Sequence, residues 1–309
     1  MINRRQFVKN LTVASATAYF AQPLSLLASN EKEVHISCQQ YPWTTFMQRE
    51  GKDWNANLTE SIKMVAKSGI KGFEPSYEKE EQVKSMRELL KEYEFESKSI
   101  YVNSILHDLT AYEASIKEAV KIAKEAKKHG AEIVVTNPTP IRWGGTEDKN
   151  DDQLKVQAHA LNELGSQIRK AGMTLAYHNH DAEMRRGARE FHHMMLGTDP
   201  KNVKLCLDAH WIYRGSGNSQ IALFDIIKLY GDRIVELHLR QSDNGIWTEA
   251  FGQGDIDYER IAFTLLEKKI KPHLVLEQAV EEGTPNTLNM VVAHQKSLEY
   301  AKAVFKDFA

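Results

Sequence analysis

Apolar residues follow two alternating patterns along the chain. In the first pattern they recur at helical spacing, as at Ile116, Ala119 and Val120, with Lys and Glu between them. This period predicts amphipathic helices that bury one face against a sheet. In the second pattern they form short uninterrupted runs, which predict buried strands. Eight such strands are predicted, at about residues 34–40, 70–74, 97–102, 131–137, 173–179, 203–208, 233–239 and 273–277.

A glycine stands between the end of several predicted helices and the next apolar run, as at Gly69, Gly130, Gly172 and Gly231. Glycine commonly ends a helix because it adopts the left-handed cap conformation. The helix–strand unit therefore repeats, and eight repeats predict one (β/α)8 TIM barrel of the α/β class. An open doubly wound sheet is the alternative. It is disfavoured because the sequence SCQQYPW at 37–43 offers no Gly-rich phosphate turn after the first strand.

Length and composition fit one catalytic domain, which we assign to residues 31–309. The chain has 309 residues, 42% of them apolar, which is enough for one barrel core. Its 40 basic and 42 acidic residues give a formal net charge of −2. Because no excess positive charge is present to hold a polyanion, we expect no nucleic acid partner. The sequence leaves the oligomeric state open, a homo-oligomer included.

The first 30 residues are predicted to be an export signal. Arg4, Arg5, Phe7 and Lys9 precede an acid-free, mildly apolar run that extends to Ala28. This order is similar to a twin-arginine signal and predicts a periplasmic protein. A chance arginine pair before an N-terminal helix is the alternative. The run is too short and polar for a permanent span, so no stable membrane anchor is expected.

The two cysteines, Cys38 and Cys206, each lie in a predicted strand. The first and sixth strands of a barrel are not neighbours, so we interpret both residues as buried free thiols. Long segments follow several strands, at 40–55, 137–152, 181–189 and 241–257. Because barrel active sites are built from the loops after the strands, these segments are predicted to be loops that cover a deep pocket.

Ionisable residues gather where the predicted strands end. They are Glu74, His178, His180, Asp208, His210, His238, Arg240 and Glu277. In a parallel barrel these ends meet on one face, and buried ionisable groups there need a metal, a partner or a substrate. Mixed imidazole and carboxylate ligands suit Mn²⁺, Zn²⁺ or Fe²⁺ better than Ca²⁺ or Mg²⁺. For each residue alone, a hydrogen bond to a neighbouring loop is the alternative.

Five motifs give the chain a resemblance to the xylose-isomerase-like barrel family, over about residues 33–305. They are YHNHDAE at 177–183, LCLDAHWIYRGSGN at 205–218, ELHLRQ at 236–241, GQGDIDY at 252–258 and LVLEQ at 274–278. That family includes sugar isomerases and epimerases, dehydroshikimate and inosose dehydratases, and repair enzymes of the endonuclease IV type. The motifs identify the superfamily rather than one reaction within it.

The resemblance implies one divalent metal ion, Mn²⁺, Zn²⁺, Fe²⁺ or Co²⁺, held by Glu, Asp, His and Glu from strands five to eight. Asp208, His238 and Glu277 match the last three positions. His178 stands where the first Glu is usual, and either His178 or Glu183 is then the fourth ligand. This departure weakens a two-base epimerase interpretation, because those enzymes use glutamates at the first and last positions.

The resemblance also suggests acid–base and substrate-binding residues. The Glu-x-His motif of the dehydratases places His180 as an acid–base histidine. We expect His180 or Glu277 to act as base, with Glu183 or His210 as proton donor to a substrate oxygen. The predicted substrate-binding set is Glu74, Trp211, Arg240, Tyr41, Trp43 and His107.

Trp211 occupies a position where many isomerases have His, and its flat face suits stacking on a sugar ring. Tyr41, Trp43, Trp143 and Trp247 are predicted to extend this aromatic platform. The alternative for each of these residues is core or surface packing.

These residues predict a metal-dependent isomerase or epimerase that acts on a free sugar or keto-sugar through an enediolate. The alternative is elimination on the same metal site, by a 3-keto-glycoside lyase or a dehydratase. The predicted export signal disfavours sugar phosphates, which are cytoplasmic. A non-catalytic sugar-binding barrel and an endonuclease IV-like enzyme are less favoured, because the ligand residues are retained and the charge is near neutral.

Overall fold

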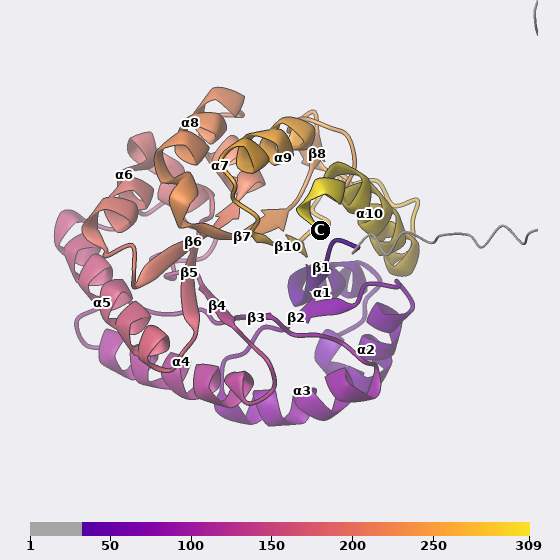
Figure 1. Ribbon diagram of the computed structural model, residues 1–309, viewed down its shortest axis with the longest axis horizontal. Coiled ribbons are helices and arrows are strands. Elements are labelled where there is room, and N and C mark those ends of the chain that lie inside the picture. The colour runs from indigo at the N-terminus through magenta and orange to yellow at the C-terminus, as the bar shows by residue number, and fades with distance from the viewer. Residues whose placement is uncertain (1–32) are drawn as a thin grey trace, which may run out of the picture. The chain divides into compact units, whose positions relative to one another are not determined.

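Eight parallel strands form a nearly closed barrel in the computed structural model, which describes residues 33–309. The strands are β1 (Ile36–Gln39), β2 (Gly72–Glu74), β3 (Ser99–Tyr101), β4 (Ile133–Thr136), β5 (Thr174–His178), β6 (Val203–Asp208), β7 (Ile234–Leu239) and β10 (His273–Leu276). Each corresponds to one predicted strand, so the TIM barrel is confirmed (Figure 1). The predicted export signal, residues 1–30, lies outside the described residues.

The strands follow the order β2-β1-β10-β7-β6-β5-β4-β3 around the barrel. The two strands at the ends of this order, β2 and β3, are joined by isolated parallel bridges from Gly72 to Glu96 and from Ser76 to Tyr101. These bridges nearly close the sheet. Adjacent strands therefore deliver their carboxyl ends to one face.

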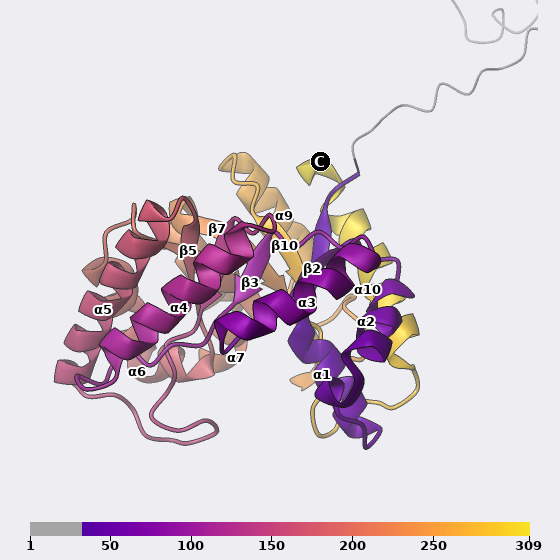
Figure 2. The ribbon, with the colours of Figure 1, turned by 90° about the horizontal axis from the view of Figure 1, so that it is seen from below.

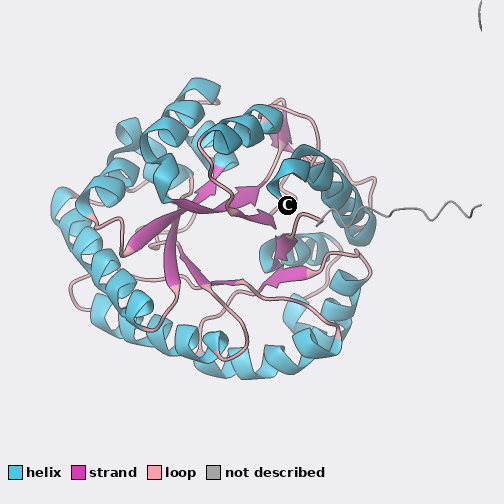
Figure 3. Cartoon of the chain, viewed as in Figure 1, coloured by secondary structure: helices cyan, strands magenta, loops and turns pink. Residues whose placement is uncertain are grey.

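Helices surround the strands as an outer ring (Figure 3). They are α1 (Gln40–Arg49), α2 (Leu58–Ala66), α3 (Glu80–Glu92), α4 (Tyr112–Lys127), α5 (Asp151–Lys170), α6 (Asp181–Gly197), α7 (Ala209–Gly215), α8 (Gln220–Tyr230), α9 (Tyr258–Glu267) and α10 (Met290–Val304). Short 3-10 turns cover Trp54–Asn57, Gly231–Arg233 and Lys306–Phe308. Among residues 33–309, no helix combines the length and the apolar character that a membrane span needs.

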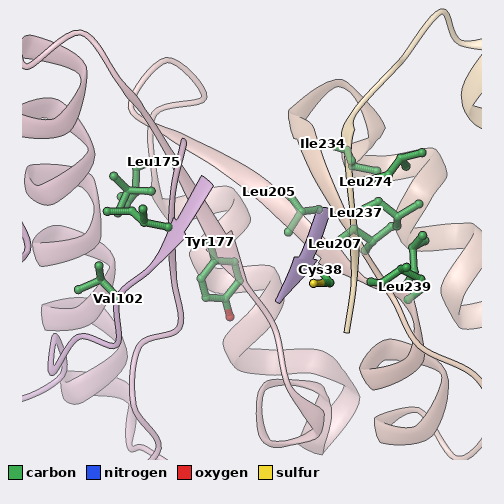
Figure 4. Packing of buried hydrophobic residues seen from close by; sticks show 14 of the residues in the cluster. Cys38, Val102, Leu175, Tyr177, Leu205, Leu207, Ile234, Leu237, Leu239 and Leu274 are labelled. Carbon is green, nitrogen blue, oxygen red and sulfur yellow. The ribbon is translucent and has the colours of Figure 1, made fainter. Parts of the chain in front are cut away.

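Successive side chains of a strand point to opposite faces, so the barrel has two packed regions. One lies between the strands and the helices, and the other lies inside the barrel. Leu205 and Leu207 of β6 belong to the main hydrophobic cluster together with Leu237 and Leu239 of β7, as Figure 4 shows. Cys206 lies between them and belongs to a separate cluster inside the barrel with Tyr101, Val135 and Ala176. Both cysteines are buried and free, as predicted. Because neighbouring positions on parallel strands face the same side, polar residues in register with Cys206 also point into the barrel.

In two of the four segments predicted as loops a helix begins directly at the strand end, so the prediction is wrong for residues 40–49 and 181–184. The Gln39 side chain caps α1, so residues 40–49 are helical. The backbone N–H of His180 donates to Glu183 and α6 starts at Asp181, but residues 185–188 depart from helical geometry and form a kink within α6. Residues 137–150 are irregular as predicted, and 241–257 contain a small hairpin of β8 (Ser242–Asp243) and β9 (Ile246–Trp247). Figure 2 shows α1, α6 and α7 at the end of the barrel opposite the C-terminus.

Candidate metal centre and active site

Four neighbouring strands bring four ligand-type side chains together at their carboxyl ends. His178 ends β5, Asp208 ends β6, His238 lies near the end of β7, and Glu277 follows β10. Asp208 and His238 are direct partners in the register of β6 and β7. One ligand atom from each of the four residues lies within 4.8 Å of the others. We call these four residues the ligand group.

The spacing within the ligand group matches the coordination of one ion. His178 Nε2 lies 3.7 Å from both Asp208 Oδ2 and Glu277 Oε2, and His238 Nδ1 lies 3.1 Å from Glu277 Oε2. Ligand atoms about 2.0–2.2 Å from a Zn²⁺ ion are separated from one another by about 3–4 Å. A small rearrangement of the side chains would therefore place all four around a single divalent ion.

Several buried atoms of the ligand group have no hydrogen-bond partner in the part of the chain that the structure describes. They are both ring nitrogens of His178 and Oδ2 of Asp208, in side chains with no solvent exposure. Such atoms are costly to bury unless something binds them. A cation would satisfy His178 Nε2 and Asp208 Oδ2, which face each other at 3.7 Å, so the residues present fit a divalent metal of the kind that accepts imidazole and carboxylate together.

Burial and neighbouring charges shift the pKa values of the ligand group, and the direction differs from residue to residue. Burial lowers the pKa of His178 to about 4, which leaves its imidazole neutral, the state that binds metal. Burial raises the pKa of Asp208 to about 7 despite the nearby Arg240. Burial also acts to raise the pKa of Glu277, but Arg240 and His238 hold it well below its ordinary value. Arg240 Nη2 lies 2.7 Å from Glu277 Oε2.

Glu183, the alternative fourth ligand, is engaged elsewhere. Its Oε2 accepts a 2.7 Å hydrogen bond from the backbone N–H of His180, and its Oε1 accepts one from Asn137 Nδ2 at 3.2 Å. Burial and the neighbouring Glu190 raise the pKa of Glu183 to about 7. The structure therefore places His178 in the ligand group and gives Glu183 the role of capping α6.

His180 lies beside the ligand group, and His210 lies against Trp211 and Trp247 at 5.7 and 5.9 Å between ring centroids. The His180 ring is 4.8 Å from the His178 ring, centroid to centroid, and 5.3 Å from Trp143. Nδ1 of His180 and both nitrogens of His210 lack hydrogen-bond partners among residues 33–309. Burial lowers the pKa of each imidazole, to about 2 for His210. Both imidazoles are therefore neutral near pH 7.

Tryptophans form one wall beside these histidines. Arg240 lies with its Cζ 5.0 Å from the Trp211 ring centroid and 4.4 Å from that of Trp247. The two indoles meet edge to face at 5.5 Å, and Trp211 lies 5.5 Å from His180. On the other side, Trp143 and His180 line a cavity of about 180 Å³ together with Glu183 and Arg185. The cavity is small and mixed in polarity, which suits a small polar molecule.

The other predicted substrate-binding residues lie in different surroundings. Glu74 is fully buried inside the barrel, with Oε1 3.3 Å from His238 Nε2. Tyr41 is 44% exposed and lines a surface cavity with Trp247 and Glu281. His107 is half-buried on the segment after β3, where burial and Lys149 lower its pKa.

The prediction for Trp43 was wrong. Its fully buried ring stacks on His294 of α10 at 3.8 Å between centroids, and its Nε1 donates to Cys38 Sγ at 3.4 Å. Because residue 40 already begins a helix, the residue three positions later turns toward the outer core instead of the site. Trp43 therefore joins α1 to α10 and lies outside any aromatic platform.

Two residues near the ligand group, Glu236 and Asn179, were not predicted from the sequence. Glu236 lies two positions before His238 on β7, and its Oε1 is 3.2 Å from His238 Nε2. Asn179 exchanges two hydrogen bonds with the backbone of Asp208, at 3.1 and 3.2 Å. The signal for Glu236 was present in the sequence, because alternate residues of a strand face the same side.

Comparison with known sequences identifies one protein family and several relatives of the chain. The sequence profile of one family, described as xylose isomerase-like TIM barrel, matches residues 62–302. An inosose dehydratase from Clostridium perfringens is 25% identical over 267 residues, which cover 77% of this chain and 88% of that protein. An inosose dehydratase from Clostridium botulinum is 25% identical over 303 residues, covering 88% of this chain and 98% of that protein.

Solved structures show the same fold at lower identity. A sugar phosphate isomerase/epimerase from Parabacteroides distasonis has a TM-score of 0.68 at 18% identity, covering 89% of this chain and 96% of that chain. A D-psicose 3-epimerase from Clostridium cellulolyticum has a TM-score of 0.67 at 14% identity, with coverages of 88% and 99%. A 3-keto-D-glucoside 4-epimerase from E. coli has a TM-score of 0.64 at 14% identity, with coverages of 88% and 100%.

Proposed function

The chain belongs to the xylose isomerase-like TIM barrel family, and on this basis we propose that it is a divalent-metal-dependent enzyme that removes a proton beside the carbonyl group of a small sugar or cyclic keto-polyol. The observation that carries the proposal is the buried ligand group, His178, Asp208, His238 and Glu277, whose ligand atoms lie within 4.8 Å of one another. A divalent ion bound there supplies a Lewis acid for a carbonyl oxygen, a contribution of several kcal/mol to charge stabilisation.

His180 is the residue that we assign as base. Its Nδ1 has no hydrogen-bond partner among the described residues, its ring lies 4.8 Å from that of His178, and it lines the cavity beside Trp143. The base takes the proton from the carbon next to the carbonyl, and the C–H electron pair becomes the double bond of an enediolate. A positioned acid–base group contributes about 10²–10⁴-fold to such a step. Arg240 and the ring of Trp211 bind and orient the substrate.

Elimination is the fate of the enediolate that we favour. When the electrons return, the carbonyl re-forms, a carbon–carbon double bond appears, and the β carbon–oxygen bond breaks. The leaving oxygen takes its proton from the imidazolium of His180, which formed when that residue removed the proton beside the carbonyl, so His180 returns to its neutral state. Two points support this choice over isomerisation: His178 stands where a two-base epimerase has a glutamate, and the sequence relatives at 25% identity are inosose dehydratases.

The test follows substrate protons in D₂O by NMR. The protein, purified without chelator, is incubated with an inosose, a 3-keto-glucoside and a panel of free ketoses. We expect loss of water or of the aglycone with formation of an unsaturated ketone, which absorbs in the near ultraviolet. Recovery of a deuterated isomer without an unsaturated product would reject elimination and establish isomerisation. Asp208→Asn is the inactive control, and absence of any exchange or product with all substrates would contradict proton abstraction.

We also propose that the protein acts in the periplasm after twin-arginine export. The support is the order of Arg4, Arg5, Phe7 and Lys9 before the apolar run in the sequence. An Arg4→Lys and Arg5→Lys double variant should accumulate in the cytoplasm with residues 1–30 uncleaved. Equal periplasmic amounts of both forms after cell fractionation would contradict the proposal.

A further inference from the structure

A chain of hydrogen bonds crosses the barrel interior below the ligand group. From His238 Nε2 it passes to Glu236 Oε1 at 3.2 Å, and from Glu236 Oε2 to His273 Nδ1 at 2.8 Å. His273 Nε2 lies 2.8 Å from Ser37 Oγ, which lies 3.3 Å from His35 Nε2. These five residues come from β7, from β10 and from β1 with its approach, three neighbouring strands in the barrel (Figure 1).

Each link in this chain is held by the fold. Glu236 and His273 are direct partners in the register of β7 and β10. Ser37 lies opposite Gly72 of β2, where an added Cβ would come within 2.0 Å of Ser37 Oγ and 2.8 Å of His35 Nε2. Only a residue without a side chain leaves room there for the serine and the histidine. Exposure rises along the chain, from 0% for His238 and Glu236 to 23% for His35.

The hydrogen bonds have one consistent direction. With Glu236 as a carboxylate, His273 Nδ1–H donates to it, so the Ser37 hydroxyl donates to His273 Nε2 and His35 Nε2–H donates to Ser37 Oγ. Glu236, an acceptor at both oxygens when ionised, also receives Nε2–H of His238.

We propose that Glu236, held by His273 and Ser37, is a positioning residue that fixes the proton of His238 on Nε2 and so leaves Nδ1 to bind the metal ion. Nδ1 is the nitrogen that faces Glu277 of the ligand group. Histidine ligands commonly donate their other ring N–H to a carboxylate, which fixes the ring and raises its basicity. This inference rests on the proposed metal-dependent function.

The test is the affinity for Mn²⁺ alone, measured by isothermal titration calorimetry on chelator-treated protein. Glu236→Gln keeps the shape but has a single acceptor oxygen, so it cannot receive both imidazole N–H groups at once. We expect a loss of about 10–100-fold in Mn²⁺ affinity with an unchanged circular dichroism spectrum. The visible absorption of the Co²⁺-loaded protein should shift as well, because a flipped imidazole changes the ligand field.

Two further variants separate positioning from general packing. His273→Gln keeps Glu236 but removes the imidazole that is hydrogen-bonded to its carboxylate. It should weaken Mn²⁺ binding less than Glu236→Gln does. Thr136→Val removes a buried hydroxyl bonded to Ser104 and to the Val102 carbonyl on the other side of the barrel. It should lower the melting temperature without changing Mn²⁺ affinity.

Three results would overturn the inference. The first is Mn²⁺ affinity of Glu236→Gln within about twofold of wild type, or, if that variant does not fold, of His273→Gln. The second is a stoichiometry of two ions that falls to one in Glu236→Gln, since Glu236 would then be a ligand. The third is an equal loss of affinity in Thr136→Val. If instead wild-type protein binds no Mn²⁺, Zn²⁺, Fe²⁺ or Co²⁺, the proposed metal-dependent function itself fails.

Discussion

Replacing His294 with Phe should make the protein more resistant to acid, although His294 lies away from the ligand group. Burial lowers the pKa of His294 to about 4, and the 2.7 Å hydrogen bond from its Nδ1 to the Met290 carbonyl opposes this only in part. In the unfolded chain the pKa returns to its ordinary value of 6.5. The unfolded state therefore binds more protons than the folded state between these two values, and stability falls as the pH decreases through that window.

The size of the effect follows from the two pKa values. A shift of about 2.5 units corresponds to about 3 kcal/mol when the window is fully crossed, and to about 2 kcal/mol between pH values of about 7.5 and 5. His294→Phe keeps an aromatic ring against Trp43 but cannot titrate. Its free energy of unfolding should therefore fall by about 2 kcal/mol less than that of wild type over the same range.

The assay is urea unfolding followed by tryptophan fluorescence at each pH, with linear extrapolation to water. Other histidines, such as His35, are present in both proteins. Their contributions cancel in the difference between the two free energies of unfolding. Equal pH dependence in wild type and His294→Phe would refute the burial of a neutral imidazole at this position.

Three further substitutions test other parts of the account. Trp43→Ala should lower the free energy of unfolding by about 3–5 kcal/mol, the usual cost for a buried aromatic residue, while Mn²⁺ affinity stays unchanged; a large loss of substrate affinity without loss of stability would instead return Trp43 to the site. Arg240→Gln should destabilise the protein by about 3–5 kcal/mol, because it leaves the buried Glu277 carboxylate unpaired. Added Mn²⁺ should restore part of this lost stability. A melting temperature of the variant that does not respond to Mn²⁺ would contradict the prediction. Trp143→Ala should raise KM with little effect on kcat or the melting temperature, because the indole is 54% exposed and contacts His180 at the cavity; an unchanged KM would exclude Trp143 from substrate binding.

The barrel was predictable because two periodicities alternate along the chain, and the structure places one strand at each apolar run. The ends of β5, β6, β7 and β10 were also predictable, since parallel strands in a barrel must deliver those ends to one face. The surroundings of Glu183 were not, because its hydrogen bonds from Asn137 and the His180 backbone form only in the folded chain.

Two other features needed the structure for different reasons. Residues 40–49 look like a polar and aromatic loop in the sequence, but the Gln39 cap makes them helical and turns Trp43 outward. The hydrogen bonds through Glu236 depend on the register of β7 against β10 and on the space left by Gly72. A strand pattern shows which face Glu236 occupies, but not which neighbour it meets there.

The central claim is that His178, Asp208, His238 and Glu277 together hold one divalent ion. Its most direct test is the metal content, by inductively coupled plasma mass spectrometry, of wild type and of Asp208→Asn purified in parallel without chelator. The account predicts about one Mn²⁺, Zn²⁺, Fe²⁺ or Co²⁺ ion per wild-type chain and loss of that ion in the variant. A folded wild-type protein that contains no such ion and takes none up, or an Asp208→Asn protein that retains the full amount, would contradict the claim.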